Sequence, residues 1–255
     1  MLSILEHFLY HAMPIGLRVA GLMSFAPFLG DVAIPTPIKA VFTIVLTALL
    51  YPVCAVPPLA LTSWGWARFA MGEITIGLGL GLCMQFVFEG AQLAGQLAGF
   101  QLSFSLVNVI DPQTNVDTPV LSVFHQLLAL LFFLRLDVHH WILRGLAKSF
   151  AYMPVGNVVI SEAVTKVLFR DATAMWLVGV QIAAPILLAT MLIDVTVGFL
   201  SKASPQLPAI LLSIPLKSLV GYVVLALAVG LWPGILEKQF ALALGWSENM
   251  LRLAQ

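Results

Sequence analysis

The feature that most constrains the fold is a polar interruption, Asn108-Val-Ile-Asp-Pro-Gln-Thr-Asn-Val-Asp-Thr-Pro119, in an otherwise apolar region between residues 95 and 143. In lipid, non-helical backbone is tolerated only where protein buries it or water reaches it, because each unpaired peptide group costs several kcal/mol. Pro112 disfavours helical geometry at Asp111, and the Asn and Asp residues favour local turns. We therefore expect a re-entrant loop that lines a cavity or a pore.

The composition is that of a membrane protein. Hydrophobic residues make up 60% of the chain and charged residues 9%, whereas soluble domains average roughly a quarter charged. Basic and acidic side chains balance at 12 each, so no net field attracts nucleic acid. We expect membrane lipid, and no nucleic acid, among the partners.

Charge-free stretches locate the expected helices, since about twenty apolar residues span a bilayer. The fold class expected is an all-α integral membrane protein, with residues 1–255 as a single membrane domain. An amphipathic segment at 138–170 separates the fourth and fifth helices. About six long helices are predicted, near residues 8–28, 38–56, 66–100, 119–136, 172–200 and 214–236.

Basic residues predict the orientation, because they concentrate in short cytoplasmic loops. The loop at 101–118 contains no Lys or Arg, so we expect it to face the opposite side or a cavity open to that side. The residues expected at the cytoplasmic face are Arg135, Arg144, Lys148, Lys166 and Arg170.

Glycines recur at helix-packing intervals, with Gly77 and Gly81 in one pair and Gly95 and Gly99 in another. A four-residue spacing puts both glycines of a pair on one helix face, where backbones can approach closely. Two interpretations stay open: packing within this chain, or a seam for other subunits.

Three acids interrupt long apolar runs: Glu73, Glu89 and Asp194. A charge at the bilayer centre costs roughly 2.5–3.5 kcal/mol on insertion scales, so each acid should face a partner or water. Glu73 has two possible mates, Arg68 and Arg18. The three acids form no Asp/Glu/His ladder of the kind that proton relay requires.

The sequence offers no catalytic or metal-binding motif. His139 and His140 are adjacent, so on a helix they point about 100° apart and do not easily share one ion. No nucleophile elbow and no HExxH helix occurs. We expect neither an enzyme nor a cofactor or metal site.

An ordered set of short motifs resembles the FliR/SctT family of type III protein secretion. The resemblance runs from about residue 14 to residue 236, and the Asp111-Pro112 loop with His139 or His140 beyond it favours the flagellar branch. The motifs are Pro27-Phe28, Ile34-Pro35, Glu73-Ile-Thr-Ile-Gly77 with Gly81, Asp111-Pro112-Gln113, Pro119-Val-Leu121, Ser204-Pro205-Gln206 and Pro215-Leu-Lys217.

The resemblance implies a subunit of a protein-export gate in the bacterial inner membrane, at the flagellum basal body. It implies a FliP-like part over 1–170 and a FliQ-like helical hairpin and tail over 171–255. The implied partners are FliP-like and FliQ-like subunits, a FliB-type (FlhB-like) export-switch protein, and unfolded flagellar substrates. Pro205 and Gln206 are implied at a subunit interface, although Pro208 departs from the polar residue usual in the family.

The resemblance also implies that the interrupting loop plugs the pore, and its residues suit that role, because apolar bulk excludes water and ions from a constriction. A well-packed loop that never moves is the alternative. The residues expected at the plug are Phe104, Leu106, Val107, Val109, Ile110, Asp111 and Pro112.

Two other functions remain as alternatives: a small-molecule or ion transporter, and the virulence counterpart SctT. Transporters often carry paired broken helices in matching halves, whereas one interruption dominates here. Binding of a small solute by the purified chain would favour a transporter, and dependence on partner subunits would favour export.

Overall fold

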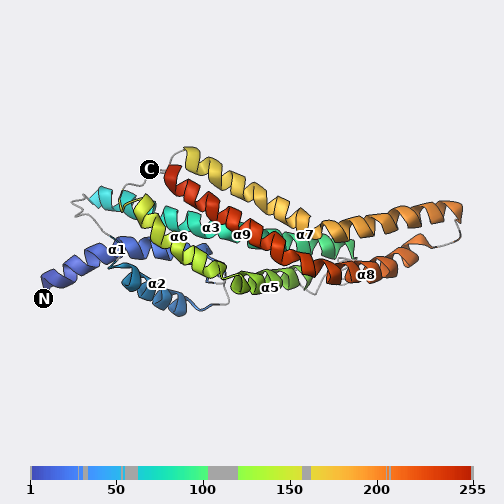
Figure 1. Cartoon of the computed structure of the whole chain (residues 1–255), viewed down its shortest axis with the longest axis horizontal. Helices are drawn as coiled ribbons and strands as arrows, with labels where there is room; N and C mark the ends of the chain where they lie inside the picture. The colour runs from blue at the N-terminus through green and yellow to red at the C-terminus, as the bar shows by residue number, and fades with distance from the viewer. Residues whose placement is uncertain are drawn as a thin grey trace. The chain divides into compact units, whose positions relative to one another are not determined.

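The computed structural model describes residues 2–27, 29–30, 34–52, 54, 63–102, 120–156, 162–204, 206 and 208–253. Within these residues the chain is helical and contains no strand, which confirms the all-α class (Figure 1). The helices are α1 (Leu2–Phe25), α2 (Thr36–Leu50), α3 (Ser63–Gln101), α5 (Val120–Arg135), α6 (Val138–Tyr152), α7 (Glu162–Ala203), α8 (Ala209–Ala228), the short 3₁₀ helix η1 (Val229–Leu231) and α9 (Trp232–Leu253).

Three of these segments are long and apolar enough to cross a membrane: Trp64–Gln101, Phe169–Ala203 and Leu211–Gly245. The described residues offer up to four spans if α5 and α6 count as one bent span, while α2 is a shorter apolar helix of 15 residues. Six spanning helices therefore remain a prediction. The expected amphipathic segment at 138–170 corresponds to α6 and the first turns of α7.

Proline sets the start of α2. Pro35 is the N-cap residue and Pro37 lies in the first turn, where a missing N–H costs no intrahelical hydrogen bond and the fixed φ suits a helix. Lys39 Nζ donates a hydrogen bond to the Gly30 carbonyl at 2.9 Å, which ties the preceding turn to the helix.

The chain forms two compact units. Unit 1 comprises Met1–Phe86, Leu134–Thr173 and Phe240–Gln255, and unit 2 comprises Val87–Phe133 and Ala174–Gln239. The helices α3, α5, α7 and α9 each contribute residues to both. The predicted division at residue 170 into FliP-like and FliQ-like parts stays a prediction.

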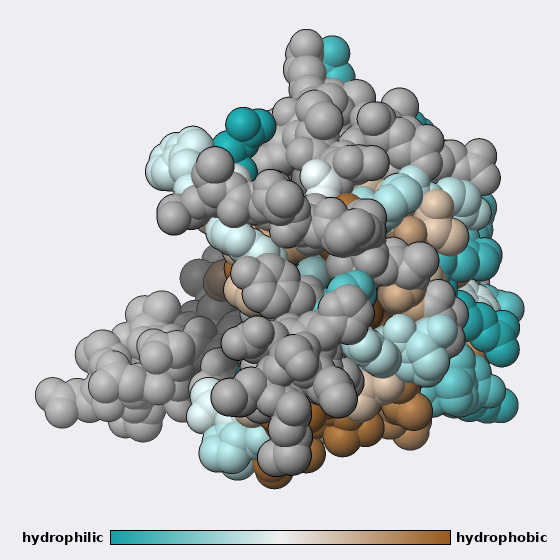
Figure 2. Space-filling view, turned by 90° about the vertical axis from the view of Figure 1, so that its left-hand side faces the viewer, coloured by the Kyte–Doolittle hydropathy of each residue, from teal (hydrophilic) through white to brown (hydrophobic). Residues whose placement is uncertain are grey.

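The core of unit 1 lies between α1, α3 and α6. Buried residues on α1 recur three or four positions apart, which is the spacing of one helix face. Figure 2 shows one face of the molecule, on which apolar residues reach the surface beside hydrophilic ones. The core side chains include Ile15, Val19, Leu22, Met23, Phe69, Ile76, Leu80, Leu146 and Phe150.

Unit 2 combines a close-packed part with a hairpin that exposes apolar side chains. Ala94 and Ala98 of α3 are fully buried, and the rings of Phe88 and Phe133 meet edge to face at 5.4 Å. On α7 and α8, by contrast, Phe199 and Leu211 are each 71% exposed. The hairpin therefore presents apolar surface that its own unit leaves uncovered.

Candidate functional site: a buried arginine cluster

The predicted pore loop lies outside the described residues. Residues 103–119 hold every expected plug position: Phe104, Leu106, Val107, Val109, Ile110, Asp111 and Pro112. Pro205 also lies outside them, and Gln206 is an exposed turn residue between α7 and α8. The plug and this interface remain predictions.

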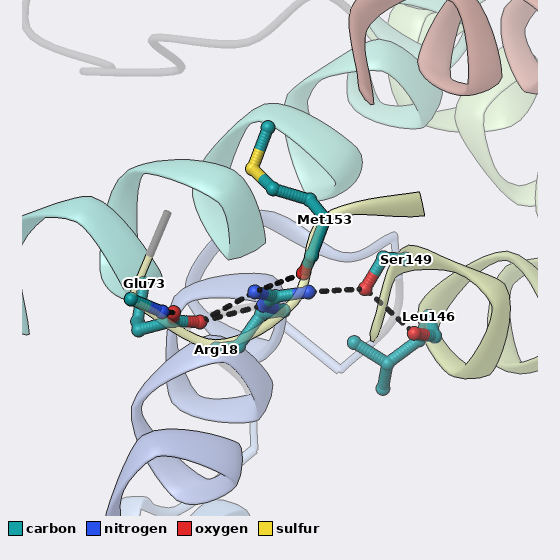
Figure 3. Close-up of polar contacts among 6 residues, drawn as sticks. Arg18, Glu73, Leu146, Ser149 and Met153 are labelled. Carbon is teal, nitrogen blue, oxygen red and sulfur yellow. Dashed lines mark hydrogen bonds and ion pairs between the residues drawn. The ribbon is translucent and has the colours of Figure 1, made fainter. Parts of the chain in front are cut away.

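The most developed polar site in the described residues is an ion pair inside unit 1. Arg18 of α1 faces Glu73 of α3 (Figure 3), and both side chains are 0% exposed. Arg18 Nε donates to Glu73 Oε2 at 2.7 Å, and Arg18 Nη2 lies 2.7 Å from the same oxygen. Of the two mates that the sequence leaves open for Glu73, the structure shows Arg18.

The remaining donors of Arg18 meet α6 and the residue that follows it. Nη1 donates to Ser149 Oγ at 3.0 Å, and Nη2 donates to the Met153 carbonyl at 3.1 Å. The guanidinium carbon lies 4.2 Å from the centroid of the Phe150 ring, a cation–π distance. The guanidinium thus joins three helices.

Glu73 is equally engaged. Its second oxygen, Oε1, accepts a hydrogen bond from the Gly156 N–H at 3.0 Å. Gly156 has φ 94°, a backbone conformation that residues other than glycine rarely adopt. The turn after α6 is thereby attached to α3. We call Arg18, Glu73, Ser149, Phe150, Met153 and Gly156 the Arg18 cluster.

Glycines bring α1 and α3 close enough for the ion pair to form. A Cβ added at Gly77 would overlap the Arg18 carbonyl and lie 2.8 Å from Leu22 N. A Cβ at Gly81 would lie 3.0 Å from the Leu22 carbonyl, and one at Gly21 would lie 2.5 Å from the Ile74 carbonyl. The predicted pair Gly77 and Gly81 therefore faces α1 of the same chain.

The energetic consequence follows from burial. Taking two charges out of water costs several kcal/mol per ion, and only close geometry with additional hydrogen bonds offsets that cost. The Arg18 cluster supplies both. Both oxygens of Glu73 accept hydrogen bonds. Glu73 therefore has a structural role, in which it links α3 to α1 and to the turn after α6.

The other predicted positions lie in different surroundings. Glu89 is half-buried on α3. Asp194 Oδ1 on α7 pairs with Lys217 Nζ on α8 at 2.5 Å, and the Asp194 side chain is 46% exposed. A Cβ added at Gly95 would lie 2.5 Å from Ser122 Cα of α5, and Gly99 is buried on α3. The three acids belong to no shared site among the described contacts.

Sequence reasoning missed a second buried polar contact. Asp171 of α7 is 0% exposed, and its Oδ2 accepts a hydrogen bond from Cys83 Sγ of α3 at 3.0 Å. Asp171 directly follows Arg170 at the polar start of an apolar stretch, so the sequence gives it the pattern of a surface residue. The burial of Arg18, which the sequence named only as a possible mate of Glu73, could have been predicted, because Ile15, Val19 and Leu22 surround it at helical spacing.

Comparison of the sequence with known protein families shows which family the chain belongs to. The sequence profile of the family described as "Bacterial export proteins, family 1" matches residues 9–243. The chain belongs to this family. The match covers every residue of the Arg18 cluster.

Family members with curated names are similar over most of their length. The flagellar biosynthetic protein FliR of Bacillus subtilis (strain 168) is 28% identical over 240 residues, which is 93% of each chain. FliR of Escherichia coli (strain K12) is 28% identical, and FliR of Pectobacterium carotovorum is 30% identical, each covering 88% of this chain and 86% of the relative. The expected resemblance to FliR is thereby confirmed.

Proposed function

We propose that this chain is a subunit of the flagellar type III protein-export gate, which forms and gates the conduit for unfolded flagellar subunits. The observation that carries the proposal is the match to FliR proteins over nearly the full length of both chains. The relatives named above are all flagellar biosynthetic proteins. This favours the flagellar branch over the virulence counterpart SctT.

The location proposed is the bacterial inner membrane, as a multi-pass protein of the flagellum basal body. Three apolar helical segments of 35 to 38 residues in the described part support membrane insertion, since about twenty residues are needed to span. The role proposed is structural and gating, with no reaction catalysed by the chain itself.

The partners proposed are FliP-like and FliQ-like gate subunits, with a FlhB-like switch protein and unfolded substrates. Membership of a flagellar export family supports association with other export components. The exposed apolar surface of α7 and α8 suits burial against neighbours or lipid. The Arg18 cluster would give unit 1 a fixed core during that assembly.

The first test combines assembly with export. The chain is co-expressed with the FliP-like and FliQ-like proteins of its own genome, extracted in mild detergent, and its native mass is measured. We expect a discrete hetero-oligomer. We also expect that deleting its gene abolishes secreted flagellin and that the wild-type gene restores it. If the chain purifies without either partner and binds a small solute, the result would support the transporter instead.

A second test addresses the plug. If residues 103–119 seal the conduit by apolar bulk, deleting residues 106–116 should raise ion conductance through the assembled complex in planar bilayers. A matched control replaces the same segment with a Gly/Ser stretch of equal length, which removes the apolar side chains and keeps the chain length. Conductance equal to wild type in both variants would contradict the plug.

A further inference from the structure

The connection between α5 and α6 brings three potential metal ligands together. Asp137 precedes α6, and His139 and His140 lie in its first turn. Asp137 Oδ1 lies 3.4 Å from His140 Nδ1 and 3.9 Å from His139 Nε2. One ligand atom from each of the three residues falls within 4.8 Å of the others.

The structure brings together side chains that the sequence did not lead us to expect at one site. Two adjacent histidines on a regular helix point about 100° apart. Asp137, however, adopts a left-handed conformation with φ 55° and ψ 26°, and its carboxylate makes no side-chain cap hydrogen bond at the start of α6. It lies instead beside both imidazoles, whose ring centroids are 4.1 Å apart.

We propose that Asp137, His139 and His140 form a binding site for a divalent transition-metal ion of the Zn²⁺ class. Ligand atoms held about 2.0–2.2 Å from a tetrahedral ion lie roughly 3.3–3.6 Å from one another. The pair Asp137 and His140 already has this spacing at 3.4 Å. The pair Asp137 and His139, at 3.9 Å, reaches it through a small rotation of side chains that are partly exposed.

The donor set selects the ion. Two imidazoles and one carboxylate suit Zn²⁺, Co²⁺, Ni²⁺ and Cu²⁺, whereas Mg²⁺ and Ca²⁺ prefer oxygen ligands alone. Three protein ligands leave a coordination position for water. Side-chain exposure of 69% at Asp137, 38% at His139 and 57% at His140 gives the ion access from solution. The site is independent of the proposed export function.

The test uses the full chain in detergent, purified through an affinity tag without histidine and treated with chelator. Co²⁺ is titrated and followed by its visible ligand-field absorption, and Zn²⁺ is titrated by calorimetry. We expect one ion per chain, with Mg²⁺ giving no signal.

Variants locate the site. His140→Gln and Asp137→Asn should each weaken Zn²⁺ binding by at least about tenfold, since the loss of even outer-shell partners costs 10- to 100-fold. His11→Gln, on α1, is the matched control and should bind like wild type. Gel filtration and circular dichroism confirm folding of each variant. The proposal is overturned if wild type shows no saturable binding, or if both site variants retain its affinity.

Discussion

Two ion pairs in this chain differ in how they are surrounded. Arg18 and Glu73 are 0% exposed, and their partners come from three helices and a turn of unit 1. Asp194 and Lys217 join α7 to α8 in unit 2, with side chains 46% and 16% exposed. The first pair is fully buried by other residues of the chain, whereas the side chains of the second pair remain partly exposed on the α7–α8 hairpin.

The long apolar helices differ in how much of their surface the chain itself covers. The chain buries 61% of an 18-residue apolar stretch within Trp64–Gln101, against 39% of such a stretch in Phe169–Ala203 and 28% in Leu211–Gly245. Apolar patches of this extent do not persist in water and mark contact with lipid or protein. The Arg18 pair therefore lies in a part of the chain that buries its own side chains, whereas α7 and α8 present apolar surface for lipid or another protein to cover.

The largest expected effect tests the enclosed pair. Glu73→Gln should lower the free energy of unfolding by about 3–5 kcal/mol, because it leaves the Arg18 charge buried without a counter-charge. The measurement is thermal unfolding of the detergent-solubilised subunit, followed by gel filtration. Wild-type stability in this variant would show that the Arg18 cluster is dispensable.

Two further variants separate charge from packing. Arg68→Gln removes the arginine that lies near Glu73 in sequence. Because Arg68 is exposed, this change should alter the free energy of unfolding by no more than about 0.5 kcal/mol.

The double variant Arg18→Met with Glu73→Leu replaces the pair by apolar side chains and should recover most of the stability that Glu73→Gln loses. Failure to recover would mean that the hydrogen bonds to Ser149 and Met153 matter more than the charges.

The next effect compares two helical glycines. Gly77→Ala should destabilise the subunit by about 1–3 kcal/mol, the usual cost of overpacking, because its Cβ meets the backbone of α1. Gly198→Ala, on α7, meets nothing within 4 Å and should be neutral or slightly stabilising through helix propensity. Both are measured by thermal unfolding. Equal effects at the two positions would contradict the close approach of α1 and α3 at Gly77.

The sequence predicted the helical class from apolar content and located α3 and α5 closely, because hydropathy reports burial in any apolar environment. The helix expected at 214–236, however, spans α8, η1 and the first residues of α9. It could not choose between Arg18 and Arg68 as the mate of Glu73, because Arg18 lies 55 positions away in sequence and meets Glu73 only through the close approach allowed at Gly77. It also missed Asp137 as a neighbour of two histidines, since only a few per cent of residues other than glycine adopt a left-handed backbone and the sequence alone does not single out this one.

The smallest expected effect tests the open pair. Asp194→Asn should change the stability of the isolated subunit by only about 0.2–1 kcal/mol, because solvent-exposed ion pairs contribute little. The measurement is a double-mutant cycle with Lys217→Gln in the same thermal assay, together with the yield of co-purified partner complex. A coupling near zero in the subunit but a reduced complex yield would show that neighbours enclose the pair on assembly. A loss as large as that of Glu73→Gln would instead show that the hairpin stabilises its ion pair as unit 1 does, and the distinction between an enclosed and an open region would fail.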